Sequence, residues 1–294
     1  MRTKVSIFLG CLLLLSVLVY LLQAQDDNAW LGTFWRTATV ADVEAVLEGG
    51  ANINARDEAG WTPLHWAAVA SQTPVVVKLL LDHGADIEAR DKDGVTPLHW
   101  AAAAIFNQTP AVVKLLLDHG ADIEARDAGG ETPLHVAANN ATPMMVKVLL
   151  DYGADIEARD KNGLTPLHSA HVAASNATPV MVKVLLDHGA DIEARSKNGS
   201  TPLHQAAANS ETPAVVEMLL DYGADIEAHD KNNSTPLHIA ALKSKTSTVV
   251  EVLLDHGADG TARDKDGKTP FDLIQDNETL KDTKAYWRLN EAQY

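Results

Sequence analysis

The sequence predicts an all-α fold in which one helical unit recurs along the chain and the units stack into a solenoid. Three observations predict it: a phrase that returns at regular spacing, an apolar run after each copy, and a Gly-Ala-Asp phrase after each run. Thr-Pro-Leu-His occurs six times, with successive copies 33 to 36 residues apart, a period typical of helical repeat proteins. The copies begin at Thr62, Thr96, Thr132, Thr165, Thr201 and Thr235, and a variant, Thr-Pro-Phe-Asp, begins at Thr269.

Each unit has the start and stop residues of two helices. Thr96 is a good N-cap, and Pro97 suits the first helical position, where a missing N–H costs nothing. Thr109-Pro110 repeats this pair and predicts a second helix, which Gly120 ends in a left-handed conformation. A polar turn then leads to the next unit. The apolar stripes of the two helices are formed by Leu98, Ala101 and Ala102 and by Val112, Val113, Leu115, Leu116 and Leu117.

These units resemble the ankyrin repeat, whose hallmarks are a T-P-L-H-x-A-A opening, a V-V-x-L-L-L helix and a G-A-D ending. The resemblance extends from about residue 30 to the C-terminus. It implies an ankyrin-repeat solenoid of helix–turn–helix–finger units, because no unit can bury its apolar face alone. The chain departs from the family between the two helices, where Thr-Pro replaces the usual Gly-His and several repeats carry extra residues.

The repeat region divides into an N-terminal capping repeat (30–61), six full repeats (62–268) and a C-terminal capping repeat (269–294). The first cap lacks Thr-Pro-Leu-His, and the last unit is more polar than the others. No Pro-, Ser- or Gly-rich linker interrupts these ranges, so we expect one domain. Residues 25–29 form a short linker in front of it.

The first 24 residues are typical of a targeting segment. Arg2 and Lys4 precede an uncharged apolar stretch, residues 5–22, and Ala24 lies near a polar exit. This order predicts a secretory signal peptide, but the stretch is also long enough for an uncleaved signal anchor, and a buried core helix is the third interpretation. Under the first two, the rest of the chain is extracytoplasmic, either periplasmic or secreted, and it is attached to a membrane only if this segment is retained.

Charge and composition argue against several function classes. The chain has 24 Lys and Arg against 40 Asp and Glu, a formal net charge of −16, which opposes binding to nucleic acid and to an anionic membrane surface. Its single cysteine, Cys11, excludes a disulfide framework and a cysteine-based zinc site. Asp, Glu and Arg recur in most fingers, so we expect rows in which opposite charges partly compensate. Attraction of a basic partner is the alternative.

The twelve histidines invite a metal or catalytic interpretation, but ten of them occupy fixed repeat positions. By the family resemblance, the histidine of Thr-Pro-Leu-His is structural and forms hydrogen bonds within the stack. Four others precede the glycine that ends the second helix, where an imidazole suits the negative end of the helix dipole. The two rows are His65, His99, His135, His168, His204 and His238, and His83, His119, His188 and His256. His171 and His229 break the pattern.

The sequence contains no recognised catalytic motif, so we expect no enzymatic activity, no cofactor and no metal site. Asp91-Lys92-Asp93-Gly94 is slightly similar to a calcium loop but lacks its closing glutamate, which favours a turn. A metal-binding or enzymatic role through the histidine rows stays open as an alternative of a different class.

The family resemblance implies protein binding through the concave surface of the fingers and first helices. Within this chain, the residue before Thr-Pro-Leu-His and the residue after its histidine vary most. Five of the six tryptophans lie in the first hundred residues, and exposed aromatic side chains are enriched at binding hot spots. The candidate partner-binding residues are Trp61, Trp66, Val95, Trp100, Ile105 and Phe106. The alternative is that tryptophans pack the cap onto the first repeats, above all Trp30 and Trp35.

We therefore expect an exported, acidic, monomeric protein that binds a protein partner and carries out no chemistry of its own. A basic protein is one candidate partner. The alternative within the same class is a membrane-anchored extracytoplasmic scaffold.

Overall fold

The computed structural model describes residues 33–36, 38–70, 74–103, 110–140, 143–170, 178–210 and 213–294. Over these ranges the chain forms α-helices and one short 3-10 helix, without β-strands, so the predicted all-α class is confirmed. The targeting segment (1–24) and the linker (25–29) lie outside the described residues, as do Trp30 and His171. None of the helices in the described ranges is both long and apolar enough to cross a membrane.

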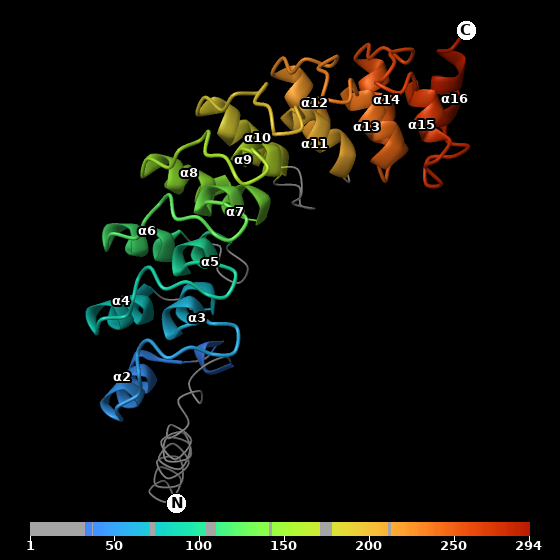
Figure 1. Cartoon of the computed structure of the whole chain (residues 1–294). Helices are drawn as coiled ribbons and strands as arrows, with labels where there is room; N and C mark the ends of the chain where they lie inside the picture. The colour runs from blue at the N-terminus through green and yellow to red at the C-terminus, as the bar shows by residue number, and fades with distance from the viewer. Residues whose placement is uncertain are drawn as a thin grey trace, which may run out of the picture. The chain divides into compact units, whose positions relative to one another are not determined.

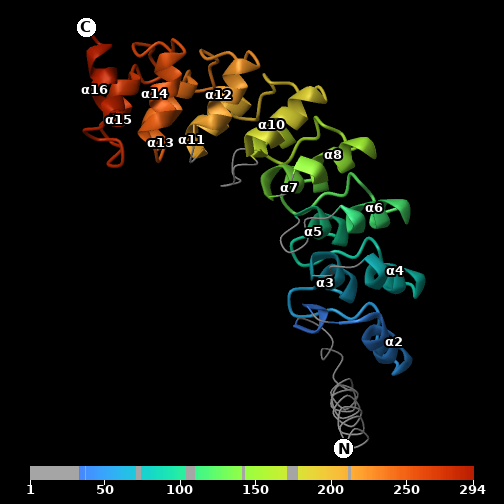
Figure 2. The ribbon, with the colours of Figure 1, turned by 180° about the vertical axis from the view of Figure 1, so that it is seen from behind.

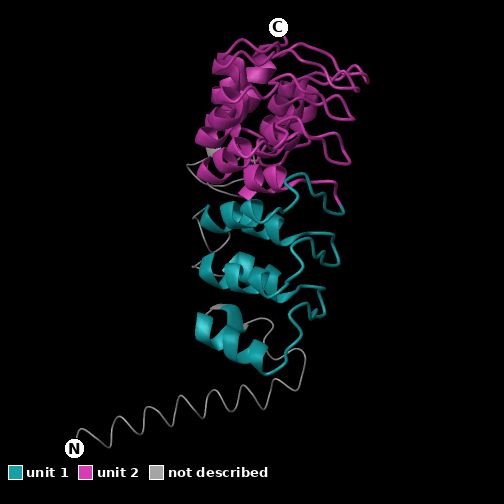
Figure 3. Ribbon diagram, turned by 90° about the vertical axis from the view of Figure 1, so that its left-hand side faces the viewer, with its two compact units in different colours: residues 1–128 teal, residues 129–294 magenta. Residues whose placement is uncertain are grey.

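The chain separates into two compact units, residues 1–128 (unit 1) and 129–294 (unit 2), which Figure 3 shows in teal and magenta. The division falls inside the range 62–268, for which the sequence predicts one uninterrupted array. The described part of unit 1 contains η1 (Thr33–Arg36), α2 (Val40–Glu48), α3 (Pro63–Ala70), α4 (Pro74–Asp82), α5 (Pro97–Ala103) and α6 (Ala111–Asp118). The described part of unit 2 contains α7 (Pro133–Asn140), α8 (Pro143–Asp151), α9 (Pro166–Ser169), α10 (Thr178–Asp187), α11 (Pro202–Asn209), α12 (Ala214–Asp221), α13 (Pro236–Lys243), α14 (Ser247–Asp255), α15 (Pro270–Ile274) and α16 (Lys284–Glu291).

Within each unit the helices stack as pairs (Figures 1 and 2). First helices pack on first helices, as α3 does on α5 and α11 on α13, and second helices on second helices, as α4 does on α6 and α10 on α12. The loops between one pair and the next, which we call fingers, project from one side of each unit (Figure 3). Successive first helices and successive fingers therefore line a continuous surface within a unit.

The predicted Thr-Pro start is present at the first helices. Thr235 is the N-cap of α13 in an extended conformation, with Pro236 in the first turn, and its hydroxyl accepts the His238 N–H at 3.4 Å. Two of the second helices differ from the expectation. The helix α6 begins at Ala111 with Pro110 at the cap position, and α12 begins at Ala214 with Pro213 there, while Thr109 and Thr212 lie outside the described residues.

Leucine, valine and alanine side chains form most of the core of each unit. Leu98, Ala101 and Ala102 of α5 are buried, as the helical stripe predicts. On α6 the core residues are Val112, Val113 and Leu116, whereas Leu115 and Leu117 are only half-buried. The buried apolar face of this helix is thus narrower than predicted, and Leu115 and Leu117 lie at its edges.

Charged side chains of the fingers hydrogen-bond to backbone groups of their own finger and of the next one. Arg195 donates from Nη1 to the Gly199 carbonyl (3.4 Å) and to the His229 carbonyl in the next finger (2.7 Å). The Glu193 carboxylate accepts the Asp225 N–H of the next finger at 2.7 Å. Stacking by one unit places each of these side chains beside backbone groups of its neighbour, which need partners.

In the finger at residues 229–233, a different side chain makes the hydrogen bond to the next finger. His229 stands where other fingers have Arg, and its Nδ1 lies 3.3 Å from the Asn233 carbonyl oxygen. Asn233 has a φ of 58° where other fingers have Gly, and its side-chain amide donates to the Arg263 carbonyl at 2.8 Å. Asn tolerates the left-handed region better than most residues. Asn233 thus supplies the link to the next finger that Arg supplies elsewhere.

Candidate functional site

Three of the predicted site residues meet in unit 1. Trp61 lies at the end of a finger, and Trp66 and Trp100 lie in the first turns of α3 and α5. The ring centroid of Trp61 is 4.5 Å from that of Trp66 and 4.3 Å from that of Trp100. All three side chains are half-buried. They form a continuous aromatic surface, which we call the tryptophan surface.

Carboxylates of the fingers hold two of these rings. Trp66 donates its indole N–H to Asp57 Oδ2 at 3.1 Å, and Trp100 donates to Asp91 Oδ2 at 3.3 Å. The other oxygen of each aspartate organises the finger, since Asp57 Oδ1 accepts the Trp61 N–H at 2.9 Å. An Asp nine residues before each indole therefore fixes both the turn and the ring.

The other residues that the sequence singled out do not belong to the tryptophan surface. Val95 is half-buried at the end of the next finger, where its N–H donates to Asp91 Oδ1 at 2.9 Å. Ile105 and Phe106 lie outside the described residues. Trp35 is 3% exposed and contacts Phe34 edge-on at 5.1 Å, which agrees with its interpretation as a packing residue.

The histidines of Thr-Pro-Leu-His link successive repeats. His65 Nδ1 accepts the Thr62 N–H at 3.0 Å, and its Nε2 lies 3.0 Å from the Val95 carbonyl oxygen. Because a carbonyl only accepts, Nε2 carries the proton and the imidazole is neutral. The same pair of bonds occurs at His135, His168, His204 and His238.

Burial keeps these imidazoles neutral. Desolvation lowers their pKa below the ordinary value because the charged form would lose more hydration than its carbonyl contact restores. The pKa of His168 falls to about 4. The pKa is also lowered at His65, His204 and His238. Both ring nitrogens form hydrogen bonds, so these histidines have a structural role in holding successive repeats together.

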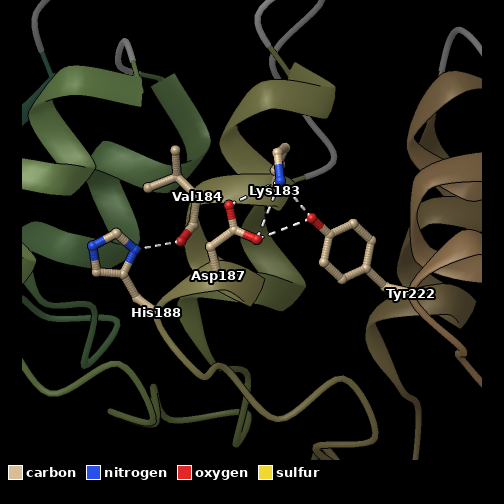
Figure 4. Close-up of polar contacts among 5 residues, drawn as sticks. All are labelled: Lys183, Val184, Asp187, His188 and Tyr222. Carbon is tan, nitrogen blue, oxygen red and sulfur yellow. Dashed lines mark hydrogen bonds and ion pairs between the residues drawn. The ribbon is translucent and has the colours of Figure 1, made fainter.

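In the second row Nδ1, rather than Nε2, donates to a carbonyl. His188, at the end of α10, has its Nδ1 2.7 Å from the Val184 carbonyl oxygen, so the proton is on Nδ1 (Figure 4). His83, His119 and His256 make the same contact with the carbonyl four residues earlier, each at 2.8 Å. Tyr222 occupies this position in the following repeat, where its hydroxyl contacts Lys183 at 2.8 Å and Asp187 at 3.0 Å (Figure 4).

Within the described ranges, no group of three or more His, Cys, Asp or Glu side chains is arranged to hold a metal ion. The calcium-like segment forms a turn, as expected. Asp91 Oδ1 accepts the N–H groups of Asp93 and Val95, each at 2.9 Å, which is the geometry of an aspartate that stabilises its own turn.

Unit 2 has a groove where unit 1 has the tryptophan surface. Its volume is about 960 Å³, and it is lined by the fingers and by α11, α13 and α15. Ser200 and Ser234 occupy the Trp61 position of their repeats, and Gln205 and Ile239 occupy the Trp66 position. The sequence identified these positions as variable, but the candidates were chosen only from the N-terminal repeats, where the tryptophans gather, so the groove was missed.

The comparisons with known proteins agree with this architecture. The family described as ankyrin repeats (3 copies) matches residues 38–127, 102–172 and 170–264. The search of curated proteins gave no match. The family matches extend over more than half of the chain. Their range holds the Thr-Pro-Leu-His helices, the paired second helices and the fingers described above. The chain therefore belongs to the ankyrin-repeat family, whose repeats mediate protein–protein interaction.

Proposed function

We propose that this protein is an exported, non-catalytic ankyrin-repeat protein that holds a protein partner on the surface of its fingers and first helices, centred on the tryptophan surface. One observation carries the proposal: the indole ring of Trp61 contacts those of Trp66 and Trp100, and all three side chains stay only half-buried. Clustered aromatic side chains that stay accessible are typical of binding hot spots, whereas aromatic side chains that only pack are usually buried.

The bonds of the tryptophan surface favour binding because they orient it in advance. Asp57 and Asp91 hold Trp66 and Trp100 through their indole N–H groups, so little rotamer freedom remains to be lost when a partner docks. These two carboxylates and the net charge of −16 favour a partner with a basic contact face. We expect the protein to act as a monomer.

Export rests on the N-terminal segment. The basic start, the apolar residues 5–22 and the polar exit support a signal peptide, and they support equally a membrane-anchored extracytoplasmic scaffold if the segment is retained. N-terminal sequencing of the mature protein distinguishes the two, since removal of residues 1–24 favours release and their retention favours anchoring.

The binding surface is tested by affinity capture from envelope and secreted fractions. Trp61→Ala/Trp66→Ala/Trp100→Ala is compared with the wild type and with Trp287→Ala, which removes a half-exposed tryptophan from unit 2. We expect the wild type and Trp287→Ala to retain a common partner and the triple variant to lose it. Circular dichroism checks that the triple variant is folded. Equal capture by a folded triple variant contradicts the proposal.

A further inference from the structure

The two carboxylates that hold the tryptophan surface offer negative charge but few free acceptor sites. In both Asp57 and Asp91, Oδ1 accepts two backbone N–H groups of its own finger, each at 2.9 Å, and Oδ2 accepts an indole N–H. Asp91 is only 9% exposed. A ligand that contacts the rings is therefore attracted by these charges, while a ligand that needs hydrogen-bond acceptors finds them already engaged.

The carbonyl oxygens at the ends of the two fingers are engaged as well. The Trp61 carbonyl accepts the Asp57 N–H at 3.0 Å, and the Val95 carbonyl accepts the Asp91 N–H at 3.1 Å and the Nε2–H of His65 at 3.0 Å. Burial lowers the pKa of His65, whose ring centroid is 6.2 Å from that of Trp61. This imidazole is neutral and adds no positive charge to the surface.

The arginines of these fingers leave the two carboxylates without a contacting cation. Arg56 and Arg90 each donate from Nη1 to a carbonyl of their own finger and to one of the next finger. Among the described residues, neither forms an ion pair with Asp57 or Asp91. A ligand that lies against the rings can supply the missing positive charge.

The indole rings present faces that suit a cation. The planes of Trp66 and Trp100 are inclined by 51° and 49° to that of Trp61, so the rings do not stack face to face and do not fully cover one another. An aromatic ring is negative on its faces and positive at its edge. The carboxylates at the indole N–H edges offset the positive part and leave the negative faces, which attract a cation.

We propose that the tryptophan surface binds a small cationic compound with a free trimethylammonium group, such as choline. This group carries positive charge but has no N–H to donate, so it matches negative rings whose carboxylates are already engaged. An ammonium or a guanidinium would lose hydration there without gaining acceptors in return. The proposal goes beyond the function proposed above, since it assigns a small ligand, rather than a protein, to this surface.

The test uses the full chain and ligand-observed NMR at constant ionic strength. Choline is compared with its neutral carbon isostere, in which a tert-butyl group replaces trimethylammonium, and with ethanolamine, which keeps the charge but has three N–H groups. We expect choline to bind at least tenfold more tightly than either, because several rings add to the cation–π attraction. Affinity is expected to rise with each methyl group added between ethanolamine and choline.

Phosphocholine distinguishes a free cationic ligand from a lipid headgroup. It keeps the trimethylammonium group but adds a phosphate, which the charges of Asp57 and Asp91 repel. We expect it to bind at least threefold more weakly than choline. Tighter binding of phosphocholine than of choline would contradict the assignment to a free cationic compound.

Two tryptophan variants locate the ligand. Trp61→Leu removes the ring that contacts both of the others and is expected to weaken choline binding at least fivefold. Trp287→Ala removes an exposed tryptophan from unit 2 and is expected to leave it within twofold. Circular dichroism checks that both variants fold. The methyl series needs only the wild type, so it decides the outcome even if Trp61→Leu unfolds.

Two charge variants separate the cation from its methyl groups. Asp57→Asn/Asp91→Asn is expected to weaken choline at least fivefold and to leave the neutral isostere within twofold. Glu44→Gln/Glu48→Gln removes two charges from exposed positions of α2 and is expected to leave both ligands within twofold.

Three results would overturn the proposal: no binding of choline, equal binding of the isostere or of ethanolamine, or equal binding by a folded Trp61→Leu variant. Partner capture separates this proposal from the proposed function. If choline does not bind but the triple tryptophan variant loses the partner, only the small-ligand proposal fails. If choline binds as expected but the triple variant keeps the partner, the small-ligand proposal stands and the protein contact lies elsewhere.

Discussion

The two histidine rows use one side chain in two protonation patterns. In the buried row the proton is on Nε2, because Nδ1 accepts a threonine N–H, as at His204. In the exposed row the proton is on Nδ1, which contacts the carbonyl four residues earlier, as at His188. The repeat positions predicted a structural role for both rows. The donor nitrogen of the buried row could not be predicted, because its carbonyl partner belongs to the next repeat, as the Ser234 carbonyl does for His204.

The buried row predicts a stability loss in mild acid. The unfolded chain binds protons near the ordinary histidine pKa of about 6.5, while the folded chain binds them only at lower pH, so stability falls as pH drops below about 6.5. For His168, whose pKa is about 4, the loss at pH 5 is about 2 kcal/mol. Urea unfolding at pH 7.5 and pH 5.0 measures the difference.

A variant of one buried histidine tests the assignment in that measurement. His204→Gln removes one lowered pKa and is expected to reduce the pH dependence. A free energy of unfolding that is equal at both pH values would contradict the assignment of the buried row as neutral.

At the scale of elements, the helices follow from local sequence and the fingers do not. Thr-Pro starts predicted the first helices, because N-capping and a fixed φ act within one turn. The finger contacts, such as Arg195 on the His229 carbonyl, depend on the neighbouring repeat. The groove was missed for the same reason, since fingers and first helices of successive repeats line it together.

Two glycines of unit 1 distinguish the cost of a left-handed backbone conformation from the cost of a steric contact with the next finger. Gly94 and Gly120 have φ values of 75° and 89°, where a side chain costs roughly 1–2 kcal/mol. A Cβ at Gly94 would also lie 3.1 Å from the Ala128 nitrogen, whereas a Cβ at Gly120 would meet nothing. We expect Gly94→Ala to destabilise the protein more than Gly120→Ala. Thermal unfolding measures both, and equal losses would contradict the close finger packing.

At the scale of the whole molecule, one repeat frame carries two different surfaces. The positions before and after Thr-Pro-Leu-His hold Trp61, Trp66 and Trp100 in unit 1, but Ser234 and Ile239 in unit 2. The frame residues are nearly constant, so changes at these positions alter the surface without disturbing the stack. The division into two units was not predicted, because repeat spacing continues through residue 128 without interruption.

The most direct test of the account is the dissociation constant of the captured partner, measured by calorimetry with wild type, the folded triple tryptophan variant and Trp287→Ala. Hot-spot residues contribute about 2 kcal/mol or more each, so we expect the triple variant to bind at least about 30-fold more weakly. Trp287→Ala should bind as the wild type does. A triple variant that is folded and binds with unchanged affinity would contradict the assignment of the tryptophan surface as the contact site.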